Sequence, residues 1–280
     1  MLQGLVTNDI EGLSESEARH AGLLSPQGKI LFDFFVIRHG DGYLLDVVQT
    51  KAADLVKRLT IYKIRAQVTI TDVSDSFKVY AAWGADSKNL VEGRGISFPD
   101  PRHRSIGLRL LVGAGDNFSV TEGAGSNSDS TAGYDALRVT FGIPEGGKDY
   151  EYGDAYPHEA DFDLLNGVSF TKGCYVGQEV VARMQNKTIV RKRAIKVSGN
   201  APLEPNSEIF LGDISAGRIG TAAGEHAIAM LRLDRVLEAE QKRQPLIAAG
   251  IAITPEEDAV DRYRTSVAAR AASTSVQSTS

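Results

Sequence analysis

The residues of this chain best suited to chemistry form one segment, 172–179, which reads KGCYVGQE and holds the only cysteine of the 280 residues. Residues 180–184 continue it with apolar side chains at the spacing of one helical face, which predicts a helix starting at the cysteine. A thiol at a helix N-terminus lies at the positive end of the helix dipole, which favours the reactive thiolate. The charge of Lys172 adds to that field. The segment therefore predicts that Cys174 is a functional thiol.

A single cysteine also has a more ordinary interpretation, which is burial as a small hydrophobic residue. The glycines and charged residues around Cys174 weigh against that interpretation. Within the segment, Tyr175 is predicted to pack or stack, and Gln178 and Glu179 to fix the loop by hydrogen bonds. Glu179 and Arg183 lie one helical turn apart and are predicted to form an ion pair.

Length and composition limit what the rest of the chain does. A chain of 280 residues can bury two or three small cores, and its net charge of −5 argues against general nucleic-acid binding. No apolar run approaches the length of a membrane span, and the start lacks the regions of a signal peptide. One cysteine forms no internal disulfide, which fits a reducing cytoplasm, and cannot by itself hold an iron–sulfur cluster. No His or Cys cluster has the spacing of zinc ligands, so no metal site is predicted.

The 172–179 segment resembles the signature of the YgfZ-type folate-binding proteins. Those proteins are similar to the aminomethyltransferase (T-protein) of the glycine cleavage system and act in iron–sulfur cluster maturation. Further matches extend the resemblance from residue 2 to about residue 255. They are the opening segment 2–10, the first hairpin at 25–30, and the approach to the cysteine at 138–144 and 157–160.

The resemblance implies an α+β fold in which three domains form an aminomethyltransferase-like ring around a central folate channel. Residues 1–48 and 133–186 would form a discontinuous, folate-binding-like first domain. Residues 49–132 would form an inserted ferredoxin-like α+β domain, and residues 187–258 a C-terminal β-barrel. The composition of the remaining stretch, 259–280, which ends in a run of Ser, Thr and Ala, predicts a disordered tail.

The apolar periodicity also predicts individual elements. In the first half, strands are predicted at 29–38, 43–48, 66–71, 77–82 and 107–112. One helix is predicted to follow a capping residue, Thr50, and another to span 135–141. Residues 123–130, almost all Gly, Ser, Asn and Asp, predict a flexible connector. A small closed barrel is predicted from short strands at 189–197, 208–211, 217–221, 227–233 and 246–253.

The resemblance implies tetrahydrofolate, or a one-carbon derivative of it, as the cofactor. A carboxylate can accept hydrogen bonds from the amino and ring N–H groups of its pterin. Glu159 stands where the family has an acidic residue near the central site, so it is predicted to bind the pterin. The alternative interpretation is that Glu159 is a negative charge favoured at the N-terminus of a helix. Asn8 and Asp9 match the family's Thr-Asn-Asp segment. Without the resemblance, their residue types would indicate turn or capping residues. Tyr175, Gln178, Glu179 and Arg183 complete the predicted cofactor-binding residues.

Asp33 is the third predicted catalytic residue, beside Cys174 and Lys172. Aminomethyltransferases have an Asp-Asp pair at the corresponding place, whereas this chain has Phe32 followed by Asp33. An Asp within an apolar strand must point to solvent or to a polar site, so Asp33 is predicted to line the channel. The loss of half the pair argues against a true aminomethyltransferase.

The preferred interpretation is a cytoplasmic folate-binding protein that supports assembly or repair of iron–sulfur proteins, with those proteins or their assembly factors as partners. The first alternative is a folate-dependent aminomethyltransferase or a related one-carbon transferase. The second is an RNA-contacting module built on a run of basic residues after position 186. The run consists of Lys187, Arg191, Lys192, Arg193 and Lys196. The simpler interpretation, which we prefer, is that these residues form the solvated face of a strand.

Overall fold

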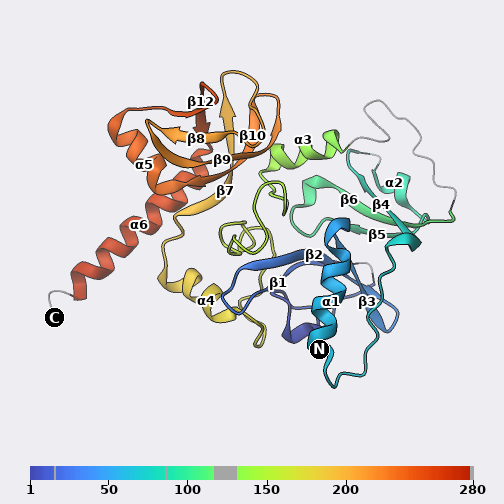
Figure 1. Ribbon diagram of the computed structural model, residues 1–280. Helices are drawn as coiled ribbons and strands as arrows, with labels where there is room; N and C mark the ends of the chain where they lie inside the picture. Colours follow the sequence, from blue (N-terminus) through green and yellow to red (C-terminus); the bar gives the residue numbers. More distant parts are fainter. Residues whose placement is uncertain (16, 86, 117–130, 278–280) are drawn as a thin grey trace. The chain divides into compact units, whose positions relative to one another are not determined.

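The computed structural model describes residues 1–15, 17–85, 87–116 and 131–277. The chain divides into two compact units (Figure 1). The first unit comprises Met1–Tyr134 and Phe162–Gln178, and the second comprises Asp135–Asp161 and Glu179–Ser280. The connector predicted at 123–130 lies outside the described residues. The three-domain boundaries that the resemblance implies stay predictions.

The first unit contains a three-stranded antiparallel sheet, β1-β2-β3. It consists of β1 (Ala18–Leu24), β2 (Ile30–His39) and β3 (Gly42–Val47). The β2–β3 hairpin confirms the two strands predicted from alternating apolar residues, whereas β1 was not predicted. One face of the sheet packs beneath helix α1 (Ala52–Lys63), whose buried Leu55 and Leu59 join the core of the sheet.

The start of helix α1 differs from the prediction in one detail. A short 3-10 helix, η2 (Gln49–Lys51), leads into α1, and the N-cap position is Lys51 rather than Thr50. No side-chain hydrogen bond caps the helix there. The helix is therefore held by the burial of its apolar face rather than by a hydroxyl cap.

A second antiparallel sheet of the first unit has the order β4-β6-β5. Its strands are β4 (Phe77–Ala82), β5 (Ile96–Pro99) and β6 (Leu108–Gly113), with helix α2 (Ser87–Val91) between β4 and β5. These strands confirm the predictions at 77–82 and 107–112. The strand predicted at 66–71 is wrong, because that segment pairs with no strand among the described residues. Its apolar pattern is explained by Ile70, which packs on the core under the first sheet.

The second unit contains a closed six-stranded barrel with the order β10-β7-β12-β11-β8-β9 (Figure 1). The strands are β7 (Lys192–Gly199), β8 (Glu208–Leu211), β9 (Ile214–Ala223), β10 (His226–Arg232), β11 (Leu246–Ala248) and β12 (Ile251–Pro255). The barrel confirms the prediction from evenly spaced short strands. The strand predicted at 246–253 is two strands, because the chain turns at Ala249 and Gly250, both with positive φ.

The described residues contain four further helices. They are α3 (Ala132–Phe141), α4 (Gln178–Lys187), α5 (Leu233–Lys242) and α6 (Glu257–Gln277). Helix α3 confirms the helix predicted at 135–141. Helix α6 occupies most of the stretch for which the composition predicts disorder, because Val260, Tyr263 and Val267 recur at helical spacing and pack on the barrel core. No helix in the described ranges is both long and apolar enough to span a membrane.

Candidate functional site

The cysteine segment forms a loop that precedes a helix. Helix α4 begins at Gln178, four residues after Cys174, so the prediction that the cysteine starts the helix is wrong. The chain turns at Gly177, whose φ is +82°. A Cβ atom there would come within 2.7 Å of the Ser25 carbonyl oxygen, so only glycine lets the loop lie this close to the first hairpin.

Side chains of the loop alternate between exposed and buried positions. Cys174 is an exposed free thiol, and Gly173 is exposed beside it. The interpretation of Cys174 as a buried hydrophobic residue is therefore wrong. Lys172 and Tyr175, on either side of this pair, are buried, and burial raises the pKa of Tyr175 to about 12. The loop thus presents its thiol outward between two buried side chains.

The Lys172 ammonium is directed at the backbone of the N-terminal segment. Its Nζ donates hydrogen bonds to three carbonyl oxygens, those of Gln3 (2.6 Å), Val6 (2.6 Å) and Asn8 (3.0 Å). Burial lowers the pKa of Lys172 to about 8, against the opposing influence of the Asp9 and Glu11 carboxylates. The effect of this charge on the thiol stays a prediction.

Gln178 closes the loop from the helix side. The side-chain Oε1 of Gln178 accepts a hydrogen bond from the Tyr175 backbone N–H at 3.2 Å. The backbone N–H of Gln178 donates to the Tyr175 carbonyl oxygen at 3.3 Å. Glu179 and Arg183 are both exposed, and no ion pair joins them among the described residues, so the predicted pairing is wrong. Both side chains point to solvent instead of fixing the loop.

Asn8 and Asp9 form the turn that the Lys172 ammonium holds. The buried Asn8 amide donates to the carbonyl oxygens of His20 (2.8 Å) and Asn166 (2.6 Å), which uses both of its N–H groups. The Asp9 carboxylate accepts from the Gln3 amide and from the Glu11 backbone N–H, each at 3.0 Å. These contacts match the turn interpretation of the two residues, and their role in binding folate stays a prediction.

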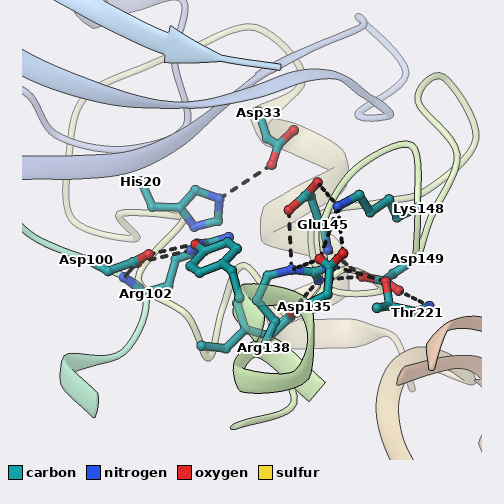
Figure 2. Close-up of polar contacts among 12 residues, drawn as sticks. His20, Asp33, Asp100, Arg102, Asp135, Arg138, Glu145, Lys148, Asp149 and Thr221 are labelled. Atoms are coloured by element: carbon teal, nitrogen blue, oxygen red, sulfur yellow. Dashed lines mark hydrogen bonds and ion pairs between the residues drawn. The ribbon is translucent and has the colours of Figure 1, made fainter. Parts of the chain in front are cut away.

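Asp33 lies on strand β2 with its side chain 13% exposed, facing His20 of strand β1 (Figure 2). His20 Nε2 is 4.0 Å from Asp33 Oδ2, and His20 Nδ1 is 3.3 Å from the Leu165 carbonyl oxygen. Burial, and secondly the charge of Arg102, lower the pKa of His20 to about 4. The ring is therefore neutral at neutral pH, with Nδ1 as its donor and Nε2 as an acceptor that faces the carboxylate.

A buried ion pair lies close to His20 (Figure 2). Arg102 donates to both oxygens of Asp100, at 3.1 and 2.7 Å, and to the Tyr134 hydroxyl at 2.7 Å. Its guanidinium also lies 4.9 Å from the centre of the Phe35 ring. Asp100 and Arg102 lie only two residues apart, but no local pattern shows that they are buried beside His20, so this group was not predicted.

Glu159 belongs to the second unit and lies in a turn rather than at a helix N-terminus. Its Oε2 accepts a hydrogen bond from the Tyr156 backbone N–H at 3.0 Å. Its backbone carbonyl oxygen accepts from the Ala194 N–H of strand β7 at 2.7 Å. The turn therefore fixes the backbone of Glu159 against the barrel, and the interpretation as a helix N-terminal charge is wrong.

A second polar cluster surrounds the fully buried Arg138 (Figure 2). Its guanidinium donates to Asp149 (2.8 Å), to Asp135 (2.7 Å) and to the Thr221 hydroxyl (3.0 Å). Glu145 adds a third carboxylate at 3.3 Å. Burial alone would lower the pKa of Arg138, but the carboxylates more than offset it and raise that pKa. Sequence reasoning missed this cluster, whose only local signal is the i, i+3 spacing of Asp135 and Arg138.

The basic run after position 186 is largely neutralised by carboxylates within the second unit. Lys192 pairs with Asp154, Arg193 with Asp161, and Lys196 with Glu256. An RNA-binding surface needs cations that remain available to phosphates. The pairs favour the solvated strand face over the RNA-contacting module. Among the residues that the structure describes, no group of three or more His, Cys, Asp or Glu is arranged to hold a metal ion.

The fold and the barrel define an aminomethyltransferase-like α+β protein. Glycine cleavage system aminomethyltransferase T from Bartonella henselae matches with a TM-score of 0.68, covering 91% of this chain and 79% of that one. The two sequences are 14% identical, so this match shows the fold alone. The family described as "CAF17, C-terminal beta-barrel domain" matches residues 191–260.

Two relatives narrow the class further. "Iron-sulfur cluster assembly factor IBA57, mitochondrial" of Mus musculus is 33% identical over 268 residues, which cover 84% of this chain and 73% of the relative. The IBA57 homolog of Mycosarcoma maydis is 36% identical over 214 residues, 71% of this chain and 52% of the relative. The chain belongs to the IBA57/CAF17/YgfZ family, which confirms the resemblance seen in its sequence. It spans about half the length of the Mycosarcoma maydis relative.

Proposed function

We propose that this protein is a tetrahydrofolate-binding factor that supports the assembly or repair of iron–sulfur proteins. The observation that carries the proposal is the exposed Cys174 thiol, held in the KGCYVGQE loop of a chain whose relatives are named iron–sulfur cluster assembly factors. The partners would be iron–sulfur proteins or their assembly factors. The cytoplasmic location stays a prediction, and the two eukaryotic relatives are named as mitochondrial.

The loop suits a thiol that acts on a second molecule. Cys174 is solvent-exposed, so it can reach a cluster intermediate, a partner thiol or an oxidised species. One thiolate supplies only one of the ligands that a cluster needs, so a partner must supply the others. The protein would therefore assist transfer rather than store a cluster.

The folate proposal includes the three-domain ring, with its inserted ferredoxin-like domain and central channel. Asp33 and His20 fit one part of the ligand, because a carboxylate and a neutral ring nitrogen 4.0 Å apart are both acceptors. The amino and ring N–H groups of a pterin are donors, so they complement such a pair. Asn8, Asp9 and Glu159 are proposed near the same ligand, together with Tyr175, Gln178, Glu179 and Arg183. When bound, tetrahydrofolate would supply one-carbon chemistry.

Tetrahydrofolate binding tests this half of the proposal. Calorimetric titration of the purified protein is expected to show saturable binding. Asp33→Asn is expected to weaken that binding at least about tenfold, since a hydrogen bond to a charged group contributes about 1.5–3 kcal/mol. Asp54→Asn changes an exposed carboxylate of the same unit and serves as the control. No binding at near-millimolar ligand would contradict the proposal.

The assembly half is tested in cells depleted of their own member of the family. Expression of this chain is expected to restore the activity of iron–sulfur enzymes, measured in extracts and normalised to enzyme protein. Enzymes without clusters should stay unchanged throughout. If the chain accumulates in soluble form and restores nothing, the assembly function is wrong.

A second candidate function is a folate-dependent aminomethyltransferase or a related one-carbon transferase, and the acidic residue kept on strand β2 supports it. Asp33 keeps one acidic residue of the expected pair, but Phe32 replaces the other. The Phe32 side chain has no polar atom, so it can neither accept a proton nor accept a hydrogen bond from an amine. We therefore place this function second.

A further inference from the structure

We propose that Lys172 is a positioning residue whose ammonium clamps the Cys174 loop onto the N-terminal segment. We call this arrangement the lysine clamp, and it consists of Lys172 Nζ and the carbonyl oxygens of Gln3, Val6 and Asn8. The importance of a fixed thiol rests on the proposed function. The clamp itself rests on geometry within the first unit.

The ammonium is fully used by the clamp. A lysine ammonium has three N–H donors, and the three carbonyl oxygens at 2.6, 2.6 and 3.0 Å take all of them. Lys172 as a whole residue is only 9% exposed, so water competes little for these hydrogen bonds. Hydrogen bonds from a charged donor are about twice as strong as neutral ones.

The site specifically requires a positive donor. Three carbonyl oxygens within 3.0 Å of one atom are close to one another, and their partial negative charges repel unless a cation lies between them. Asp9 and Glu11 add negative charge around the ammonium. The Tyr175 ring lies 5.2 Å from Nζ and contributes a cation–π contact.

The clamp holds both sides of the exposed thiol. Lys172 lies two residues before Cys174 and is bound to the N-terminal segment, while Tyr175 follows the thiol and packs its ring against the same ammonium. Gln178 fixes the Tyr175 backbone from the other side. Only Gly173 and Cys174 are left as the exposed part of the loop, so the position of the sulfur depends on the ammonium.

The N-terminal segment has other attachments, so loss of the clamp should leave the fold intact. The Thr7 hydroxyl donates to the Gly167 carbonyl oxygen at 2.6 Å and accepts from the Gly22 N–H at 2.8 Å. The Thr7 carbonyl oxygen accepts from the Ser169 N–H at 3.0 Å. None of these three contacts uses the Lys172 ammonium, so they remain when its side chain is removed. The expected effect is therefore confined to the thiol loop and its N-terminal partner.

The single cysteine allows a direct test, because a nitroxide attached to it reports only this loop. Electron paramagnetic resonance of the labelled protein is expected to show a nitroxide of restricted mobility. The spectrum of the labelled Lys172→Met variant is expected to contain a clear mobile component. Hydrogen exchange of amides in residues 3–8 should become about tenfold faster in the variant, as expected when hydrogen bonds to a charged group are lost. Lys57→Met, at an exposed lysine of the same unit, should change neither measurement.

Two further variants separate positioning from general stability. Leu59→Ala removes a core side chain of the first unit, so it should lower Tm while leaving the nitroxide restricted in the folded protein. In Lys172→Ala, added propylammonium should restore the restricted spectrum, because it replaces the three methylene groups and the ammonium that the substitution removes. Tetramethylammonium carries the charge without a donor and should not restore it.

Unchanged nitroxide spectra and unchanged amide exchange in both Lys172 variants would overturn the proposal. So would equal mobility in Leu59→Ala, because that would make the effect one of stability alone. None of these measurements uses folate or an iron–sulfur enzyme. Failure of the clamp is therefore distinguishable from failure of the proposed function.

Discussion

Replacing Arg138 by Met is expected to destabilise the second unit by about 3–5 kcal/mol, the usual cost of breaking a buried ion pair from one side. Both Arg138 and its partner Asp149 have side chains with no exposed surface. Methionine fills most of the volume but leaves the Asp149 carboxylate buried without its counter-charge. The remaining donors to Asp149, the backbone N–H groups of Glu145 and Thr221, cannot replace a full positive charge.

Urea unfolding of the whole chain, followed by circular dichroism, measures this effect. Arg264→Met is the matched control, because Arg264 pairs with Glu240 on the surface and such pairs contribute about 0–1 kcal/mol. The double variant Arg138→Met with Asp149→Asn should regain part of the loss, since it also removes the buried charge. A loss in Arg138→Met no larger than that in Arg264→Met would show that the cluster does not stabilise the unit.

Replacing Cys174 by Ala is expected to abolish the restoration of iron–sulfur enzyme activity in depleted cells, down to the level of cells without the chain. Alanine is close to cysteine in size but removes the only thiol of the chain, the group that can bind iron as a thiolate or exchange with a partner thiol. Since the side chain is exposed, the stability of the protein should change by less than about 0.5 kcal/mol. Cys174→Ala is thus predicted to abolish the restored enzyme activity while leaving the stability of the protein nearly unchanged.

Thr171→Ala provides the control, because it removes a polar group from an exposed position directly before the segment and leaves the thiol in place. Cys174→Ser tests whether sulfur itself is needed, and we expect it to fail as Cys174→Ala does. Variant levels are compared by immunoblot. Full restoration by Cys174→Ala would remove the thiol from the mechanism and leave the folate proposal to be judged alone.

The elements found from the sequence are those that a local pattern defines. The β2–β3 hairpin and the barrel strands alternate apolar and polar residues over short runs, so their own residues contain the information. The extended segment 66–71 shows the limit of this reasoning, because Ile70 satisfies its pattern by packing on a core without joining a sheet. The start of α6 shows the opposite case. Its few apolar residues do not predict a helix by themselves, and the helix is explained only by their packing on the barrel core.

The candidate site was only partly predictable for a related reason. The motif identified Cys174 and Lys172, but no local spacing could show that the Lys172 ammonium binds the Gln3 carbonyl oxygen, 169 positions earlier. The same holds for Asn8, whose amide is bound to Asn166. Such partners are fixed by how the chain returns to its own N-terminal segment. Local reasoning therefore found residues with chemistry but misassigned the atoms that they contact.

Closure of the barrel determines which part of this protein should aggregate first on heating. Each of its six strands has a hydrogen-bonded neighbour on both sides, so the barrel offers no open edge that could recruit a strand from another molecule. Among the described strands of the first unit, β1, β3, β4 and β5 are edge strands, and β1 is covered on its outer side only by the single bridge between Val6 and Leu23. Aggregation on heating should therefore begin in the first unit, and the barrel should be the last part of the chain to enter the aggregate.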